Sequence, residues 1–264
     1  MEIWNKTSIY NKLHIVGGIM FILNISENKS NYSQRKTQYV HTQKGEYGEN
    51  KIDWTCTCNV HSLVMAALYS GWVFPKSSYE REPDALADYI INECLKKNNW
   101  FKEKMPKLWE NWYKGDPNAY TPLELHAVLA HYFNTYLGCS KADEFKESVS
   151  IKEIVIQLYK NRIGVPTSVK WAGLNGHIIC LVGFECSSEE DLLAWLDGTQ
   201  PNPITKIIFD DPWGKYIENT DSYLGKESGN DCEVSYSTFE KCVKNTNNPS
   251  FKYAHILNKP AVSV

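Results

Sequence analysis

Three short apolar segments that favour β structure place the strongest constraint on the fold of this chain. They span residues 165–171, 178–184 and 204–209. Gly176 precedes the second segment and Pro212 closes the third, and such punctuation of apolar runs is typical of buried strands. The connection at 172–176 is short enough for a hairpin. We therefore expect these strands to form an antiparallel sheet.

A fourth apolar segment has helical periodicity. Its apolar residues recur at Val60, Leu63, Val64, Ala67 and Leu68, and Gly71 follows as a stop signal. One side of the predicted helix is expected to be buried. Cys58 stands at the start of the helix, so burial of the helix would fix the position of its thiol.

The remaining signals indicate one α+β domain covering residues 1–264. Proline and capping-box signals predict further helices at residues 83–95, 121–137 and 150–160. Hydrophobic residues make up 42% of the 264 positions, which is enough for a sizeable core, and no repeat or low-complexity linker is visible. The net charge is −3 and no basic face stands out, so nucleic acid is not expected as a partner.

The ends of the predicted elements carry residues suited to nucleophilic catalysis. Cys58 begins the helix, where unpaired N–H groups and the helix dipole favour a thiolate. His177 opens the second strand, and Asp211 follows the third. A histidine can pair with a thiolate and later protonate a leaving group, and an aspartate can orient that histidine. The sequence therefore predicts a cysteine hydrolase whose cleft lies between the helix and the sheet.

Each of these residues also has a purely structural interpretation. Cys58 taken alone is a small buried apolar residue, His177 a strand-edge histidine and Asp211 a turn-forming residue. The hydrolase hypothesis rests on their conjunction, because all three fall at the ends of elements rather than inside them.

Short motifs around these residues resemble those of a known family. Residues 57–66 read Thr-Cys-Asn-Val-His-Ser-Leu-Val-Met-Ala, Gly-His at 176–177 opens an apolar run ending in Val-Gly-Phe, and residues 211–214 read Asp-Pro-Trp-Gly. They resemble the Cys-Asn-Val-Thr-Ser-Leu-Ala-Met signature, the histidine motif and the Asn-Asp-Pro-Tyr/Trp-Gly motif of bacterial C39-like peptidases, a papain-like family. Residues 236–239 and 253–257 resemble the C-terminal end of that family.

The resemblance implies a papain-like cysteine peptidase fold with a core at about residues 40–258, in which a helical subdomain carrying the nucleophile packs against an antiparallel sheet. It implies Cys58 as nucleophile, His177 as general base and acid, and Asp211 as orienting acid. The expected substrate is a peptide or protein, cleaved through a thioester acyl-enzyme. Neither a cofactor nor a metal is expected.

Two positions depart from the family pattern. The family places a glutamine upstream of the cysteine to donate a hydrogen bond to the developing oxyanion. Gln43 is the best match here, with Asn50 as the alternative donor. His61 stands where the family motif usually has threonine, and we expect it to pack or to lie at the surface.

Two segments lie outside the expected core. Residues 1–39 form an N-terminal extension whose apolar stretch, Lys12–Leu23, is faintly like a signal peptide. We favour a strand or hairpin packed on the domain. Residues 187–203 form an insertion with a capped helix at 187–196, which could overhang the cleft or lie on the far side of the sheet.

The eight cysteines lack the paired spacing of a zinc site and are expected to be reduced. A bond between Cys56 and Cys58 would disable the nucleophile, which favours a cytoplasmic over a secreted location. No segment is long and apolar enough to span a bilayer. Frequent lysine and asparagine suggest a bacterial or phage source.

The leading hypothesis is a cysteine peptidase. Two alternatives remain open: a cell-wall peptide amidase or lysin with the same three residues, and a catalytically silent binding module. The same Cys-His-Asp set serves both enzymes, so the sequence does not separate them.

Overall fold

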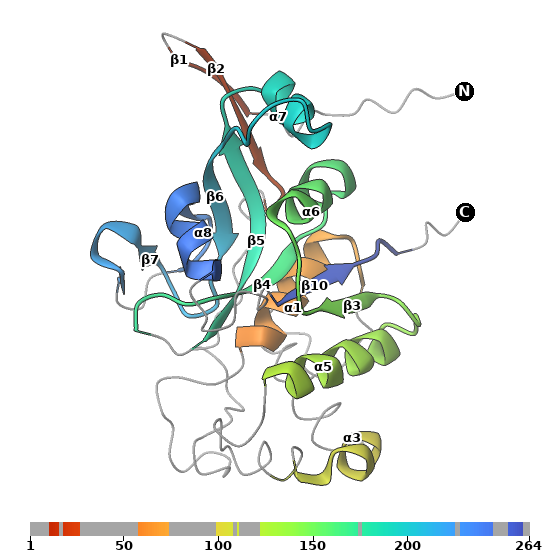
Figure 1. Ribbon diagram of the computed structural model, residues 1–264. Helices are drawn as coiled ribbons and strands as arrows, with labels where there is room; N and C mark the ends of the chain where they lie inside the picture. The colour runs from red at the N-terminus through yellow and green to blue at the C-terminus, as the bar shows by residue number, and fades with distance from the viewer. Residues whose placement is uncertain are drawn as a thin grey trace, which may run out of the picture.

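An antiparallel sheet surrounded by helices forms the part of the chain that the structure describes (Figure 1). The computed structural model describes residues 11–15, 18–26, 58–73, 99–107, 110, 122–173, 176–224, 228–244 and 253–260. The strands are β1 (Asn11–Ile15), β2 (Gly18–Asn24), β3 (Asp143–Lys146), β4 (Val165–Val169), β5 (His177–Cys186), β6 (Ile204–Asp210), β7 (Tyr216–Ile217), β8 (Ser222–Tyr223), β9 (Cys232–Ser235) and β10 (Ala254–Leu257). The helices are α1 (Cys58–Tyr69), α3 (Asn99–Lys104), α5 (Pro122–Tyr136), α6 (Ile151–Ile156), α7 (Glu189–Leu196) and α8 (Tyr236–Lys244), with a π-helical turn η2 (Gln157–Asn161) and a 3-10 turn η3 (Glu218–Thr220). The α+β class and the antiparallel sheet are as predicted.

β5 is the central strand of the sheet. Its first half pairs with β4 and its second half with β2, while β6 pairs along its other edge and is followed outward by β9. On the far side of β4, β10 and β3 extend the sheet, and β7 and β8 pair separately as a small ribbon. The three strands predicted from the apolar segments are therefore neighbours in the order β4–β5–β6. All ten residues of β5 are buried, which accounts for its almost continuous apolar sequence.

The predicted helix at Cys58 is confirmed as α1, which ends at Tyr69 and is followed by Gly71 with a φ of +90°. The expectation that only one side is buried was wrong. Every residue from Asn59 to Ala67 is buried, including the polar His61 and Ser62. A helix buried all round fits its position in the centre of the molecule, where it contacts β4, β5 and β10 (Figure 1).

The N-terminal segment forms a hairpin, as favoured from the sequence. β1 pairs with β2, and β2 pairs with the second half of β5. Gly183 is required at this junction, because a Cβ there would lie 2.0 Å from the Leu23 carbonyl oxygen. The hairpin therefore belongs to the same sheet as the rest of the strands.

The insertion at 187–203 lies away from His177. It contains α7, whose N-cap Ser188 accepts a hydrogen bond from the Asp191 amide at 3.0 Å. Because α7 begins three residues after β5 ends, it lies near Cys186, whereas His177 is at the other end of this ten-residue strand (Figure 1). The insertion does not overhang the His177 end of the sheet.

The other predicted helices are partly described. α5 covers residues 122–136 with Gly138 (φ +66°) after it, close to the predicted 121–137. α6 begins at the predicted capping box, where Ser150 Oγ accepts from the Glu153 amide at 3.1 Å, and η2 continues it to Asn161. The predicted helix at 83–95 lies outside the described residues.

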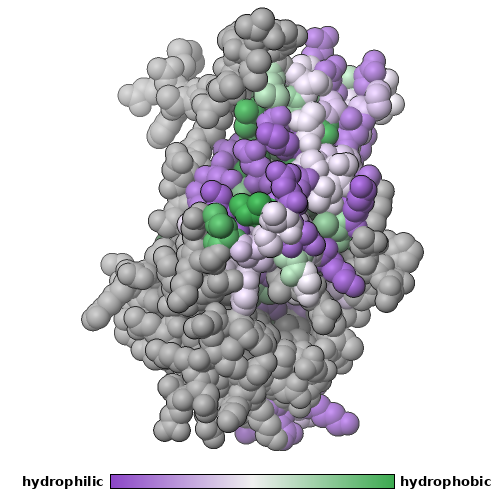
Figure 2. Space-filling view, turned by 90° about the vertical axis from the view of Figure 1, so that its left-hand side faces the viewer, coloured by the Kyte–Doolittle hydropathy of each residue, from purple (hydrophilic) through white to green (hydrophobic). Residues whose placement is uncertain are grey.

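The face that carries α8 and the β7–β8 ribbon is mainly hydrophilic where it is described, with only small hydrophobic patches (Figure 2). Among the described residues, the exposed large hydrophobic side chains are Val73, Leu193 and Leu224. None of the described helices is long and apolar enough to cross a membrane.

Candidate active site

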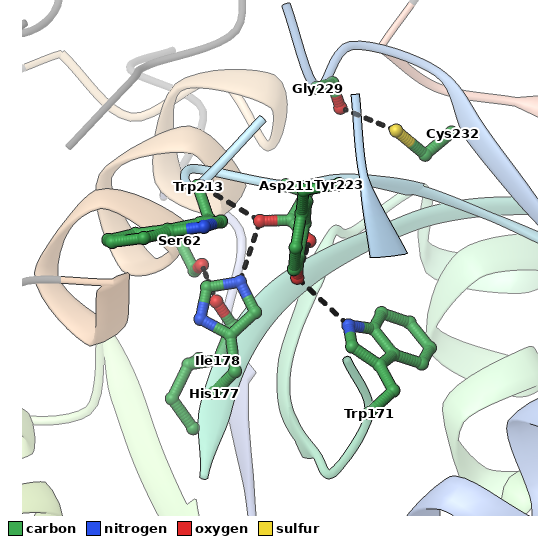
Figure 3. A network of polar contacts seen from close by, with 9 residues as sticks. All are labelled: Ser62, Trp171, His177, Ile178, Asp211, Trp213, Tyr223, Gly229 and Cys232. Atoms are coloured by element: carbon green, nitrogen blue, oxygen red, sulfur yellow. Dashed lines mark hydrogen bonds and ion pairs between the residues drawn. The ribbon is translucent and has the colours of Figure 1, made fainter. Parts of the chain in front are cut away.

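Cys58 is the first residue of α1 and carries a free, half-buried thiol. The first turn of a helix has backbone N–H groups without intrahelical partners, and the helix dipole adds to them, so negative charge is favoured there. One turn further on, Ser62 Oγ donates a hydrogen bond to the Ile178 carbonyl oxygen at 3.0 Å (Figure 3). This bond ties the first turns of α1 to the start of β5, where His177 lies.

His177 is the first residue of β5, opposite Val169 of β4, and its side chain is 3% exposed. Gly176, just before it, has a φ of +138°, a conformation that other residues rarely adopt. The imidazole Nε2 lies 2.6 Å from Asp211 Oδ1 (Figure 3). The histidine is thus held at the end of the sheet by a strand pairing and by a buried carboxylate.

Asp211 is the residue that follows β6, and it is fully buried. Its Oδ1 also accepts a hydrogen bond from the Trp213 amide at 2.8 Å, which closes the Asp-Pro-Trp turn. Its own amide donates to the Gly229 carbonyl oxygen at 2.8 Å. A Cβ at Gly229 would lie 2.1 Å from the Asp211 carbonyl oxygen, so the close approach of these two loops requires glycine.

The three residues predicted for the site are brought together by the fold. Burial by itself would lower the pKa of His177, because it disfavours the imidazolium. The charge and hydrogen bond of Asp211, followed by the hydrogen bond and charge of Cys58, outweigh burial and raise the pKa of His177 to about 10. Since Asp211 takes Nε2, Nδ1 is the ring nitrogen left for Cys58. The resulting order of contacts is Cys58–His177–Asp211.

Two aromatic residues that were not selected from the sequence also lie beside Asp211. The Tyr223 hydroxyl donates to Asp211 Oδ2 at 2.9 Å, and Trp171 Nε1 donates to the Tyr223 hydroxyl oxygen at 2.9 Å (Figure 3). Trp171 follows β4 and Tyr223 ends β8, so they come from separate parts of the chain. Tyr223 sits in a two-residue strand with no periodic pattern, and no signal in the sequence singles it out.

The neighbouring Asp210 belongs to a different network. Its Oδ2 accepts from the Tyr69 hydroxyl at 2.6 Å and its Oδ1 from the Asp231 amide at 2.8 Å. Burial raises the pKa of Asp210 to about 7, against the lowering effect of these two hydrogen bonds. Asp210 is the last residue of β6 and connects this strand to the end of α1, whereas Asp211 faces His177.

Of the other residues selected from the sequence, only His61 lies among the described residues. Gln43 and Asn50, the two candidate oxyanion donors, lie outside the described residues. His61 is completely buried in α1, which agrees with the expected packing role. Within the described ranges, no group of three or more His, Cys, Asp or Glu side chains is arranged to hold a metal ion.

A second buried polar cluster lies between α5, β3 and β10. His255 Nδ1 lies 2.6 Å from Asp143 Oδ2, and His255 Nε2 lies 2.9 Å from His126 Nδ1. Phe145 and Tyr253 stack on the His126 ring, with centroids 4.9 and 5.0 Å away. Among the described residues, this cluster has no nucleophile in its hydrogen-bonded chain, and it joins one helix to two strands of the sheet.

Comparisons with known proteins leave the site to be judged on its geometry. No family model matches the chain, and no curated protein matches its sequence.

Proposed function

We propose that the chain is a papain-like cysteine peptidase of the C39-like type, with Cys58 as nucleophile, His177 as general base and acid, and Asp211 as orienting acid. The observation that carries the proposal is the position of His177: its Nε2 lies 2.6 Å from Asp211 Oδ1, and Cys58 is, after Asp211, a cause of its raised pKa. A histidine with a carboxylate on one nitrogen and a thiol on the other is the arrangement that nucleophilic cysteine catalysis requires.

The proposed reaction begins with a thiolate on Cys58 and an imidazolium on His177. Because the pKa of His177 is raised to about 10, the imidazolium persists at neutral pH and its Nδ1–H can donate to the thiolate. The sulfur attacks the carbonyl carbon of the substrate amide and forms a C–S bond. His177 then gives its Nδ1 proton to the leaving nitrogen as the C–N bond breaks, which leaves a thioester on Cys58.

Hydrolysis of the thioester completes the cycle. The neutral His177 accepts a proton from water at Nδ1 while the water oxygen bonds to the acyl carbon. The C–S bond then breaks, the carboxylic acid leaves, and Cys58 and His177 return to the thiolate and imidazolium. Gln43, with Asn50 as the alternative, is the proposed donor to the oxyanion of both tetrahedral intermediates.

The test offers the protein two classes of substrate: a mixture of unstructured peptides and purified cell-wall peptide. Mass spectrometry would detect new amino termini and an acyl adduct on Cys58. The expected result is cleavage of peptides that is lost in Cys58→Ser and retained in Cys139→Ser, a matched change at another half-buried free thiol.

Cleavage confined to the cell-wall peptide would replace the peptidase proposal by the amidase. Binding without cleavage of either substrate, unchanged in Cys58→Ser, would support the silent binding module and overturn the enzymatic proposal.

A further inference from the structure

Hydrogen bonds connect two aromatic side chains, Trp171 and Tyr223, to Asp211, the carboxylate that also contacts His177. Trp171 Nε1 donates to the Tyr223 hydroxyl oxygen at 2.9 Å, and this hydroxyl lies 2.9 Å from Asp211 Oδ2. The other carboxylate oxygen, Oδ1, lies 2.6 Å from His177 Nε2. Tyr223 and His177 therefore occupy different oxygens of one buried carboxylate (Figure 3).

The chemistry of Trp171 fixes the direction of these hydrogen bonds. An indole N–H can only donate, so the Tyr223 oxygen must accept from it. The single proton of the Tyr223 hydroxyl is then directed to Asp211, and the carboxylate receives it as an acceptor. Burial, followed by the charge of Asp211, raises the pKa of Tyr223 above its ordinary value, so the hydroxyl keeps this proton.

An acceptor carboxylate leaves one arrangement for the imidazole. Nε2 must carry a hydrogen in order to donate to Asp211 Oδ1, and in the neutral ring Nδ1 is then the unprotonated nitrogen. Nδ1 is also the nitrogen left for Cys58. The direction of these hydrogen bonds thus selects the tautomer whose lone pair faces the thiol.

We propose that Tyr223, held in place by Trp171, is a positioning residue that fixes the orientation and tautomer of His177 through Asp211. This inference rests on the proposed function, because it assigns Tyr223 a part in preparing the same Cys58–His177 pair.

Packing around Tyr223 supports a defined position for its hydroxyl. Its ring meets the His177 ring edge-on, with centroids 6.2 Å apart and an interplanar angle of 90°. Trp171 stacks on Tyr216 at 4.3 Å and 13°, and Tyr216 lies directly opposite Tyr223 in the β7–β8 ribbon. Trp171 and Tyr223 are therefore held by an aromatic cluster. This cluster also includes Phe209, whose ring centroid lies 5.1 Å from that of Trp171.

The test compares Tyr223→Phe with Tyr216→Phe. Both variants remove one hydroxyl from the same ribbon, but the Tyr216 hydroxyl donates to Asp221, at 2.9 Å, instead of Asp211. Nitrogen-15 NMR of the histidine rings would report the tautomer and the pKa of His177. Alkylation of Cys58 by iodoacetamide, at about pH 6, would report its coupling to His177.

In Tyr223→Phe the Asp211 carboxylate loses the donor that fixes its orientation, so its hydrogen bond to His177 Nε2 should weaken. We therefore expect the pKa of His177 to fall by about one unit, a mixed tautomer once the ring is neutral, and Cys58 labelling slower by roughly three- to tenfold. Tyr216→Phe should match the wild type in all three measurements. Trp171→Phe keeps the Tyr223 hydroxyl but removes the indole that donates to it. The pKa of His177 should then change in the same direction as in Tyr223→Phe, by a smaller amount. This variant serves as the test if Tyr223→Phe fails to fold.

Two outcomes separate the positioning role from the proposed function. If wild-type Cys58 labels rapidly and in a His177-dependent manner, but Tyr223→Phe and Trp171→Phe leave the titration and tautomer of His177 unchanged, the positioning role is overturned and the proposed function stands. If wild-type Cys58 labels no faster than the other thiols and ignores His177→Ala, both are overturned.

Discussion

Replacement of Ser62 by alanine tests how the position of the thiol is set. Ser62 is completely buried, and its hydroxyl donates to the Ile178 carbonyl oxygen at 3.0 Å, so the bond joins α1 to β5 beside both Cys58 and His177. Loss of one buried hydrogen bond costs about 1–2 kcal/mol, and the hydroxyl leaves too small a space for a large cavity term. The melting temperature should therefore fall by only a few degrees.

Reactivity should fall further than this stability loss implies. With the tie to Ile178 removed, the start of α1 is less firmly held against His177, and misplacement of reacting groups by a fraction of an ångström is costly. We expect Cys58 alkylation, at about pH 6, to slow on the order of fivefold.

Ser70→Ala is the matched control. Ser70 directly follows α1, and its buried hydroxyl donates to the carbonyl oxygen of Ala66 in that helix at 2.6 Å, so this bond does not connect α1 to the sheet. The Ser70→Ala variant should lose stability but should show no change in the rate of Cys58 labelling. Equal labelling rates in Ser62→Ala and Ser70→Ala, with both variants folded, would refute the claim that the Ser62 bond positions the thiol.

Two further predictions address the loop that holds Asp211 and the second buried cluster. Gly229→Ala would place a Cβ 2.1 Å from the Asp211 carbonyl oxygen, so the loop that holds Asp211 must shift. We therefore expect alkylation of Cys58 to be at least tenfold slower in this variant. Alkylation at the wild-type rate would contradict the assigned role of the loop. Burial, followed by the charge of His255, holds the pKa of His126 well below its ordinary value. Below about pH 6.5 the unfolded His126 gains a proton and the folded one does not, so stability should fall by up to about 1.4 kcal/mol per pH unit until the lower folded pKa is reached. Denaturant unfolding between pH 7 and 5 should therefore show a steeper loss in the wild type than in His126→Gln, and parallel curves would contradict the assignment.

The local elements could be predicted because each has its own pattern. The apolar runs of β4, β5 and β6 end at glycine, proline or aspartate, and α1 combines helical spacing with a glycine stop. Cys58, His177 and Asp211 could be selected for the same reason, since each lies at a boundary between such elements. Their contact depends on the antiparallel order β4–β5–β6 with α1 packed against it.

The donors around Asp211 could not be predicted. Tyr223 belongs to a two-residue strand, and Trp171 could equally have been a core residue of the predicted strand. Tyr223 bonds to Asp211 from 12 residues further along the chain, and Trp171 bonds to Tyr223 across 52 residues, so both contacts result from tertiary packing. Local periodicity carries no information about such contacts.

The burial of Ser62 in α1 and the contacts of the second cluster could not be predicted from the sequence for a related reason. Ser62 falls on the side of α1 that a one-sided helix would expose, but the structure buries it because α1 is covered on all sides. His126 and His255 come from distant segments, and only the fold places them 2.9 Å apart with Asp143 behind them. The sequence did not decide on which part of the sheet the insertion at 187–203 lies. The length and direction of β5 determine its position.

The most direct test of the account is the rate of Cys58 alkylation by iodoacetamide as a function of pH, with mass mapping of the modified cysteine in wild type and in His177→Ala. The account predicts that wild-type Cys58 labels fast at about pH 6, well below the range in which ordinary thiols react, and at least tenfold more slowly without His177. The half-buried thiols of Cys139 and Cys242 should label slowly in both proteins. Labelling of Cys58 at the rate of these two cysteines, with no response to His177→Ala, would contradict the claim that the fold builds a thiolate–imidazolium pair.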